Sequence, residues 1–425
     1  MPAVAGSLSV HSHPVVTPEL TAEWDDLVDR AGATPFHRPG WFTAWWDAFG
    51  AGSRRVVTVR RGEALVAVMP LVERRGVVSS PTNWHSFVSG PVAVDDAART
   101  LLLEHVLASG RRVELSHLTT PVSESTTDTL TRRGAHVRGE IVQRSPYVPG
   151  DVTFESYVDR REARRVRQLQ RNRRKLEKLG PVRYVADGGD LDAAVARFLE
   201  IEASGWKGES GTAILSDART RAFYAGLAAW AGAAGLLRVA FLELDGRAIA
   251  GELCLEDEYA TYPLKASYEP DHRPYSPGLI LLFEQIRTSV ESGRSYEFMG
   301  SAEPYKMRWA DDVRDIHRLD VHPATLPGRA TLLADLGVRT ARRGAGLGKR
   351  VATDARDRAR ALLARRASAR RGGVAEPTAL PAQRDAVEAT AVVRPPQFAS
   401  KADRNAASAR SGSPAAQPSR ATTPS

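Results

Sequence analysis

Residues 273–278 have the composition of an anion-binding loop. In the order Arg-Pro-Tyr-Ser-Pro-Gly, Ser276 suits the N-cap of a helix and Pro277 suits its first position. A helix that starts there presents free backbone N–H groups and the positive end of its dipole to a bound anion. Gly278 has no Cβ, so a phosphate group could approach the backbone closely. The sequence therefore predicts a phosphate-binding site.

The elements around this loop follow from apolar spacing and turn residues. A helix is expected from Pro277 to Gly293, because apolar residues recur on one face between them. Pro277 suits the start of a helix and Gly293 suits its end. Asp245-Gly246 predicts a tight turn between two strands. The predicted strands are residues 239–244, 248–255, 259–268 and 296–299. The loop is thus expected between a strand and a helix.

Composition limits the class of protein. A chain of 425 residues with 42% hydrophobic residues has room for two or three domains. It has no apolar run of about 18 residues and no basic, then apolar, N-terminal segment, so neither a membrane span nor secretion is expected. The single Cys254 excludes an internal disulfide and is expected as a buried small hydrophobic residue. A cytoplasmic location is predicted.

The positive charge is concentrated in a C-terminal tail. Residues 327–425 hold 19 of the 59 Lys and Arg and 7 of the 50 Asp and Glu, leaving 40 basic and 43 acidic residues before them. The part before the tail is therefore nearly neutral. The tail is rich in Ala, Pro and Ser, so we expect it to be largely disordered, apart from a helical stretch at 330–366. Its expected partner, if it has one, is an anionic surface.

A second basic region is a predicted helix over residues 159–179. An interrupted apolar stripe indicates that one face packs against the protein. The basic side is either a solvated surface or an electropositive wall that attracts a polyanion. Nucleic acid is less favoured because the basic helix lacks aromatic residues for base stacking. Its cations are Arg160, Arg161, Arg164, Arg165, Arg167, Arg171, Arg173, Arg174, Lys175 and Lys178.

The first part of the chain repeats a sequence pattern found in the second part. Residues 55–60 and 64–72 predict a hairpin with a Gly-containing turn, like the hairpin at 239–255, which suggests an internal duplication. Residues 1–16 are expected to be a loose leader. His85 and His117 lack partners at metal-ligand spacing, so no metal site is expected.

Several segments together carry a family resemblance. They are Pro35-Phe36 with Trp41, Trp45-Trp46 and Phe49-Gly50, residues 164–180 and 205–208, Lys265-Ala-Ser-Tyr268, Tyr275-Ser-Pro-Gly278, and residues 298–309. In this order they resemble the CelD/BcsL-like branch of the GNAT acetyltransferases, and more distantly the Fem-type peptidyltransferases of cell-wall synthesis. The resemblance implies an α/β (α+β) fold of tandem GNAT-like halves, at 15–155 and 156–322, followed by the tail at 327–425.

In that family the pyrophosphate of coenzyme A lies over a Gly-rich loop between a strand and a helix. The resemblance therefore implies acetyl-CoA or another acyl-CoA as co-substrate, without a metal. It places the cofactor over Arg273, Tyr275, Ser276 and Gly278. Ser276 replaces the first Gly of the family's loop, and Pro277 removes one N–H donor.

Acyl transfer to an amine needs a base for the amine and a proton for the leaving thiolate. Under the resemblance, Glu252 could be the base, Tyr305 the acid, and Glu303 a group that binds or deprotonates the acceptor. The structural alternatives are a Glu252 turned to solvent or paired with Arg, and pairing of Lys306 with Glu303. The candidate substrate-binding residues are Trp206, Lys207, Lys265 and Lys306, and Trp309 either lines the cleft or belongs to the core.

The leading hypothesis is an N-acyltransferase that acts on the amino group of a small molecule or of a cell-envelope or polysaccharide precursor. One alternative is a Fem-type transferase that uses aminoacyl-tRNA, with the basic helix as its RNA contact. Another is a non-catalytic envelope-assembly or nucleic-acid-binding protein, which the missing N–H donor at Pro277 keeps open.

Overall fold

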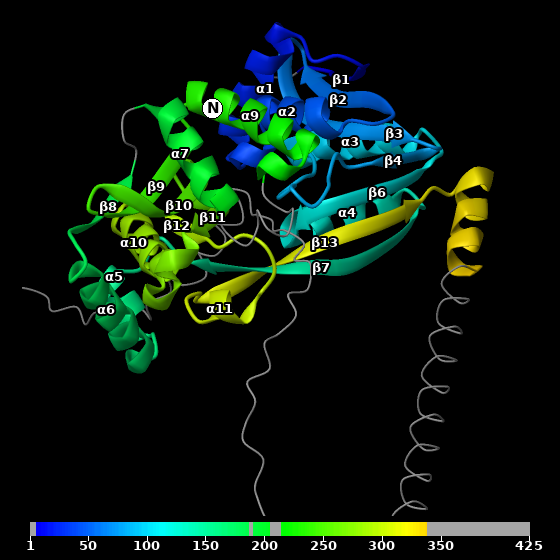
Figure 1. Cartoon of the computed structure of the whole chain (residues 1–425). Coiled ribbons are helices and arrows are strands. Elements are labelled where there is room, and N and C mark those ends of the chain that lie inside the picture. The colour runs from blue at the N-terminus through cyan, green and yellow to red at the C-terminus, as the bar shows by residue number, and fades with distance from the viewer. Residues whose placement is uncertain (1–5, 187–189, 205–213, 338–425) are drawn as a thin grey trace, which may run out of the picture.

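The computed structural model describes residues 6–186, 190–204 and 214–337. Within this part the strands form one mixed sheet in the order β1-β2-β3-β4-β6-β13-β7-β12-β11-β10-β9-β8, and β5 pairs with β3 (Figure 1). The strands are β1 (Leu8–His13), β2 (Ser53–Arg61), β3 (Ala64–Arg74), β4 (Val77–Ser79), β5 (Val92–Ala93), β6 (Arg112–Thr119), β7 (His136–Val148), β8 (Val182–Ala186), β9 (Leu237–Leu244), β10 (Arg247–Glu256), β11 (Ala260–Tyr268), β12 (Ser295–Glu297) and β13 (Asp312–His322).

Helices cover both faces of this sheet. They are α1 (Pro18–Ala31), α2 (Pro39–Phe49), α3 (Asp96–Leu107), α4 (Thr120–Arg132), α5 (Phe154–Asp159), α6 (Ala163–Glu177), α7 (Leu191–Ser204), α9 (Ala218–Ala233), α10 (Pro277–Glu291) and α11 (Pro304–Met307), with short turns η1 (Pro35–His37), η2 (Ile214–Ser216) and η3 (Pro270–Tyr275). None of the helices that the structure describes is long and apolar enough to cross a membrane.

The hairpin β9–β10 confirms the sequence prediction. Asp245 and Gly246 both have positive φ angles, 51° and 76°, as a type I′ turn requires. Helix α10 begins at the predicted Pro277, and the β12 strand is shorter than the predicted 296–299. Cys254 is completely buried in β10, as expected.

The expectation of a loose leader at residues 1–16 is wrong for residues 8–13. These residues form β1, which pairs antiparallel with β2 along its whole length. Leu8 and Val10 pack against the core on one side, while Ser9 and His11 are exposed. Their alternation fits a strand at the edge of a sheet.

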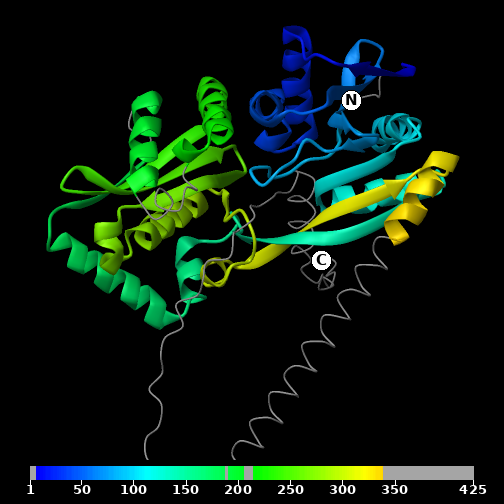
Figure 2. The ribbon, with the colours of Figure 1, turned by 45° about the vertical axis from the view of Figure 1, so that its right-hand side comes forward.

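The long strands β7 and β13, which the sequence did not predict, join the two parts of the sheet. β13 lies between β6 and β7, and β7 pairs in turn with β12 of the second part (Figures 1 and 2). The last described strand is therefore inserted between two strands from the first part of the chain. The boundaries 15–155 and 156–322 stay a prediction.

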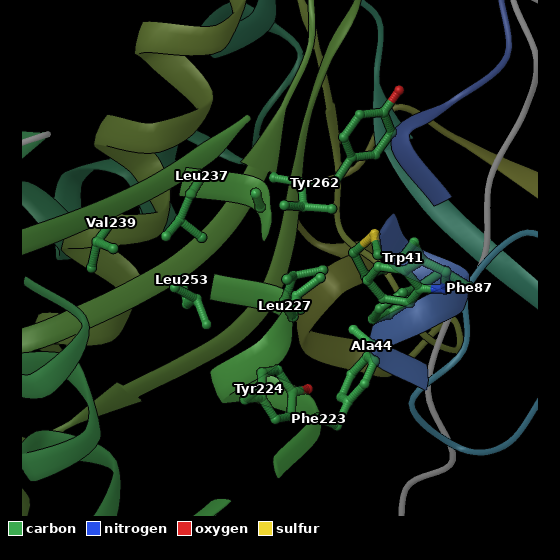
Figure 3. Packing of buried hydrophobic residues seen from close by; sticks show 14 of the residues in the cluster. Trp41, Ala44, Phe87, Phe223, Tyr224, Leu227, Leu237, Val239, Leu253 and Tyr262 are labelled. Carbon is green, nitrogen blue, oxygen red and sulfur yellow. The ribbon is translucent and has the colours of Figure 1, made fainter. Parts of the chain in front are cut away.

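The two parts also share a hydrophobic core (Figure 3). Trp41 of α2 meets Phe223 of α9 edge to face, with ring centroids 5.3 Å apart. Gly40 allows this approach, since a Cβ at Gly40 would lie 2.0 Å from Trp230 Nε1. Aromatic contacts of this kind hold α2 and α9 together and fix the position of one part relative to the other.

Candidate functional site

The start of α10 has the predicted Pro277 but an unexpected cap. Ser276 has φ 54° and ψ 50°, in the left-handed region, and its side chain makes no capping hydrogen bond. Its hydroxyl accepts instead from Asn172 Nδ2 of α6, at 3.2 Å. The interpretation of Ser276 as a conventional N-cap is therefore corrected, because an N-cap serine has an extended backbone and bonds the helix amides.

One backbone amide at this helix start is free. The N–H groups of Leu279 and Ile280 both bond to the carbonyl of Ser276, at 3.0 and 3.2 Å. Pro277 has no N–H, and the amide of Gly278 has no acceptor among the described residues. A Cβ on Gly278 would lie 3.3 Å from Cδ1 of Tyr268, so the ring of Tyr268 flanks this glycine.

Helix α6 places positive charge beside the start of α10. Its packed side consists of Val166, Leu169 and Leu176, with Asn172 at the same spacing. The outer side carries exposed cations with no ion pair among the described residues, namely Arg164, Arg167, Arg171, Arg174 and Lys175. Arg273 of η3 is also exposed. A helix N-terminus with these cations nearby attracts anions.

The predicted basic helix 159–179 is shorter in the structure, where it corresponds to α6. α5 ends at Asp159 and α6 begins at Ala163. Between them Arg160 and Arg161 turn to Asp311, and the Arg160 Nη2–Asp311 Oδ2 distance is 2.8 Å. These two cations are thus used within the fold, as are Arg165 and Arg173 of α6, which pair with Glu162 and Glu284, whereas the five exposed cations of α6 form no ion pair with a described residue.

A buried carboxyl group with a raised pKa and a tyrosine partner lies beneath α10. Tyr296 of β12 donates a 2.6 Å hydrogen bond to Oε1 of Glu252 on β10, and both side chains are buried. Burial raises the pKa of Glu252 to about 7, although hydrogen bonds from Tyr296 and Gln285 oppose this rise. The alternatives of a solvent-turned or Arg-paired Glu252 are therefore wrong.

Gln285 of α10, which hydrogen-bonds Glu252, links this pair to the helix. Its Oε1 accepts from Tyr184 Oη at 2.6 Å, and its Nε2 donates to Cys254 Sγ at 3.5 Å. Neither Tyr296 nor Gln285 was predicted as a site residue. No local signal in the sequence marks them, since Gln285 stands beside Glu284, and Tyr296 stands between Ser295 and Glu297.

Glu303, Tyr305 and Lys306 lie in and around α11. The Lys306 Nζ–Glu303 Oε2 distance is 2.6 Å, and Nζ also donates to the carbonyl of Met299. The structural alternative for this pair is therefore present. Tyr305 is 49% exposed, and its pKa is raised by partial burial and then by the charges of Glu303 and Glu252. Tyr305 thus lies within electrostatic reach of Glu252.

Lys265 lies on the opposite face of the sheet from Glu252. Ala266 is the partner of Glu252 in the β10–β11 ladder, whereas Lys265 is the partner of Leu253. Its ammonium nitrogen lies 5.2 Å from the ring centroid of Trp84 and 5.6 Å from that of Tyr224. The structure does not bring Lys265 together with Glu252.

Of the remaining residues that were singled out from the sequence, those that the structure describes lie in different environments. Trp309 is 5% exposed and belongs to the hydrophobic core beneath α10. Trp206 and Lys207 lie outside the described residues. His85 is buried and bonds Thr220 Oγ1 at 3.2 Å, and burial lowers its pKa to about 3. The described residues contain no group of three or more His, Cys, Asp or Glu that could hold a metal ion.

A polar surface on the sheet was also missed. The ladders place Gln143 and Ser145 of β7, Thr119 of β6 and Glu297 of β12 on one face. All four are buried, and each has a polar side-chain atom without a hydrogen-bond partner in the part of the chain that the structure describes. Buried polar atoms require partners, so this face can bond water or a polar ligand.

The sequence comparison agrees with this geometry. Residues 163–307 match the model of the acetyltransferase (GNAT) domain, which confirms the CelD/BcsL-type resemblance for this segment. The matching segment runs from α6 to α11 and contains the α10 start, Glu252, Tyr296 and Tyr305. No curated protein matches the chain.

Solved structures resemble the chain over most of its described length. The crystal structure of FemX is 12% identical, with a TM-score of 0.53, over 76% of this chain and 99% of that chain. A tandem GNAT protein from the clavulanic acid biosynthesis pathway is also 12% identical, with a TM-score of 0.38, over 74% and 98%. The likeness to FemX shows the fold, and the predicted mixed α/β, tandem GNAT-like architecture is confirmed.

Proposed function

We propose that this protein is an N-acyltransferase that uses acyl-CoA, with acetyl-CoA as the preferred donor. The acyl group is transferred to the amino group of a small molecule or of a cell-envelope or polysaccharide precursor. One observation carries the proposal. Within the segment that matches the GNAT domain, the buried Glu252–Tyr296 pair lies on the face of the sheet that α10 covers. Helix α10 therefore covers a potential proton acceptor and also provides an electropositive helix start.

The residues at the start of α10 fit a diphosphate group. The free amide of Gly278 and the helix dipole would face it, and Arg273 would add a charge-assisted contact. Lys175 of α6 lies one turn beyond Asn172, which contacts Ser276. When bound, acyl-CoA supplies a thioester that an amine can attack.

Glu252 is the proposed base. Its carboxyl pKa of about 7 means that it is close to half protonated at neutral pH, the condition in which a base both is available and can accept a proton. The Tyr296 hydroxyl holds Oε1 in place and acts as a positioning residue. The proton of the acceptor amine passes to the carboxylate, directly or through a water.

Tyr305 is the proposed acid. Its hydroxyl, with a pKa above the ordinary tyrosine value of about 10, is protonated at neutral pH and can give its proton to the basic thiolate that leaves. Glu303 is less suited to proton transfer, since the ammonium of Lys306 holds its carboxylate. We therefore assign Glu303 and Lys306 to positioning Tyr305 rather than to the reaction itself.

The acceptor is proposed to be polar. The unpartnered atoms of Thr119, Gln143, Ser145 and Glu297 favour a molecule with several hydrogen-bonding groups, such as an amino sugar or an amino acid. These residues come from β6, β7 and β12, in the region where the two parts of the sheet meet.

A second candidate is transfer from aminoacyl-tRNA. The observation that favours it is the row of exposed, unpaired cations on α6, which would contact RNA phosphates. Binding through such contacts weakens steeply with salt, whereas recognition of one CoA molecule depends less on it. Salt dependence therefore separates the two candidates.

Calorimetric titration with acetyl-CoA and free CoA tests the proposal, followed by thiol release with a panel of amino sugars and amino acids. Micromolar binding to the native protein is expected. Lys175→Glu should weaken it about tenfold, while Arg164→Glu, at the other end of α6, should change it less. A folded native protein that binds neither ligand at millimolar concentration would overturn the proposal. Tight, salt-sensitive binding of tRNA in its place would establish the second candidate.

A further inference from the structure

The helix that begins at residue 326 exposes an apolar side. It is described as far as residue 337 and lies beside the end of β13, well away from α10 (the gold helix in Figures 1 and 2). Leu326, Leu333 and Leu336 are 83%, 70% and 51% exposed. Their spacing of seven and three residues places them on one side of the helix.

The opposite side of this helix is fixed to the sheet. Thr331 Oγ1 lies 3.0 Å from Nδ1 of His322, the last residue of β13, and also donates to the carbonyl of Gly328 at 2.8 Å. Gly328 packs so closely that a Cβ there would lie 2.1 Å from the carbonyl oxygen of Pro323. The orientation of the three leucines is therefore set by contacts on the other side.

Strong positive charge follows directly in the sequence. Residues 338–371 contain twelve Lys and Arg and only two Asp and Glu. Apolar side chains next to a basic segment are the combination that binds the surface of an anionic bilayer, where the leucines enter the interface and the cations meet lipid phosphates. Residues 326–371 contain no aromatic residue for base stacking, and exposed leucines add nothing to phosphate contacts, so nucleic acid fits this surface less well.

We propose that Leu326, Leu333 and Leu336 dock this protein on an anionic phospholipid surface, to which the positive charge of the sequence that follows them is complementary. The docking surface is separate from the residues assigned to acyl transfer. It would bring the residues proposed for acyl transfer to substrates at a membrane.

Vesicle co-sedimentation of the full chain tests this proposal, with phosphatidylcholine vesicles prepared with and without phosphatidylglycerol. Binding is expected only with phosphatidylglycerol, and added salt should weaken it. The double variant Leu333→Asp/Leu336→Asp should bind about tenfold less. Leu179→Asp, at an exposed leucine beyond the end of α6, is the matched control and should bind as the native protein does.

Thermal unfolding and sedimentation velocity are measured on the same variants, so that loss of folding or of a dimer is recognised. Absence of vesicle binding by the native protein would overturn the proposal, as would equal binding by the double variant. A fall in molecular mass caused by the double variant would show that a second copy covers the leucines instead. Preferential binding to RNA that is unaffected by the leucine changes would assign the basic segment to nucleic acid.

Discussion

The hydroxyl of Tyr296 lies 2.6 Å from Oε1 of Glu252, and β11 runs between the strands that carry these two residues. The Glu252 side chain is covered from above by α10 and has no cation as a partner among the described residues. Burial without a cation is what raises the pKa of this carboxyl to about 7. The proposed base thus owes its proton affinity to the packing of a helix on a sheet.

The first prediction concerns stability and pH. Because the pKa of Glu252 rises from 4.5 to about 7 on folding, its contribution to stability is complete below pH 4.5 and is lost as the pH rises through 7. Glu252→Gln should therefore gain stability relative to the native protein by about 3 kcal/mol between pH 4.5 and pH 8. Denaturant unfolding at several pH values measures this difference, and parallel pH curves for the two proteins would contradict it.

The second prediction separates the roles of Tyr305 and Glu303. Tyr305→Phe should lower kcat about 100-fold and leave the Kd for CoA nearly unchanged, because the hydroxyl is needed only as a proton donor. Glu303→Gln should have a smaller effect on kcat and should lower the melting temperature, since it removes the partner of Lys306. Full activity of Tyr305→Phe would remove this residue from the mechanism.

The third prediction concerns Gly278. Gly278→Val should weaken CoA binding more than about tenfold, because a branched side chain would fill the space at the free amide. The control is the same change combined with Tyr268→Ala, which removes the ring that lies 3.3 Å from a Cβ at position 278. Calorimetry should show no recovery in the double variant. Recovered affinity would show that the glycine serves the packing of Tyr268 and not the cofactor.

The fourth prediction compares two truncations. Removal of residues 372–425 should change the melting temperature by less than about 2 °C, because this Ala-, Pro- and Ser-rich segment offers no core. Truncation after Asp311 should abolish cooperative unfolding, since it removes β13 and leaves β6 and β7 without their shared partner. Circular dichroism during heating distinguishes the two. A large loss of stability in the shorter truncation would show that the tail packs on the folded part.

Local patterns in the sequence determined the elements around the proposed cofactor site. Asp245-Gly246 specifies the turn between β9 and β10, and Pro277 with the apolar spacing after it specifies the start of α10. The identity of residues 273–278 likewise predicts an anion site, because a helix start attracts anions through its own backbone.

The sequence could not predict the strands that join the two parts. β13 is rich in charged residues, and β7 lacks the regular apolar alternation that marks a strand, because their neighbours in the sheet and their ion pairs stabilise them instead. The leader strand β1 was missed because its apolar–polar alternation is short, and its pairing with β2 is what establishes it as a strand. In each case the stabilising partner is distant in the sequence.

The arrangement of the proposed catalytic residues was likewise decided by tertiary structure. The sequence provides Glu252 and Tyr305, but a side-chain hydrogen bond across β11 joins Tyr296 to Glu252, and the β10–β11 register turns Lys265 to the opposite face. A register shift between Leu253 and Cys254 contributes to this placement, and no local propensity encodes it. Residue types therefore determine which chemistry is available, whereas register and burial determine which groups meet and what proton affinity they have, because both depend on contacts between distant segments.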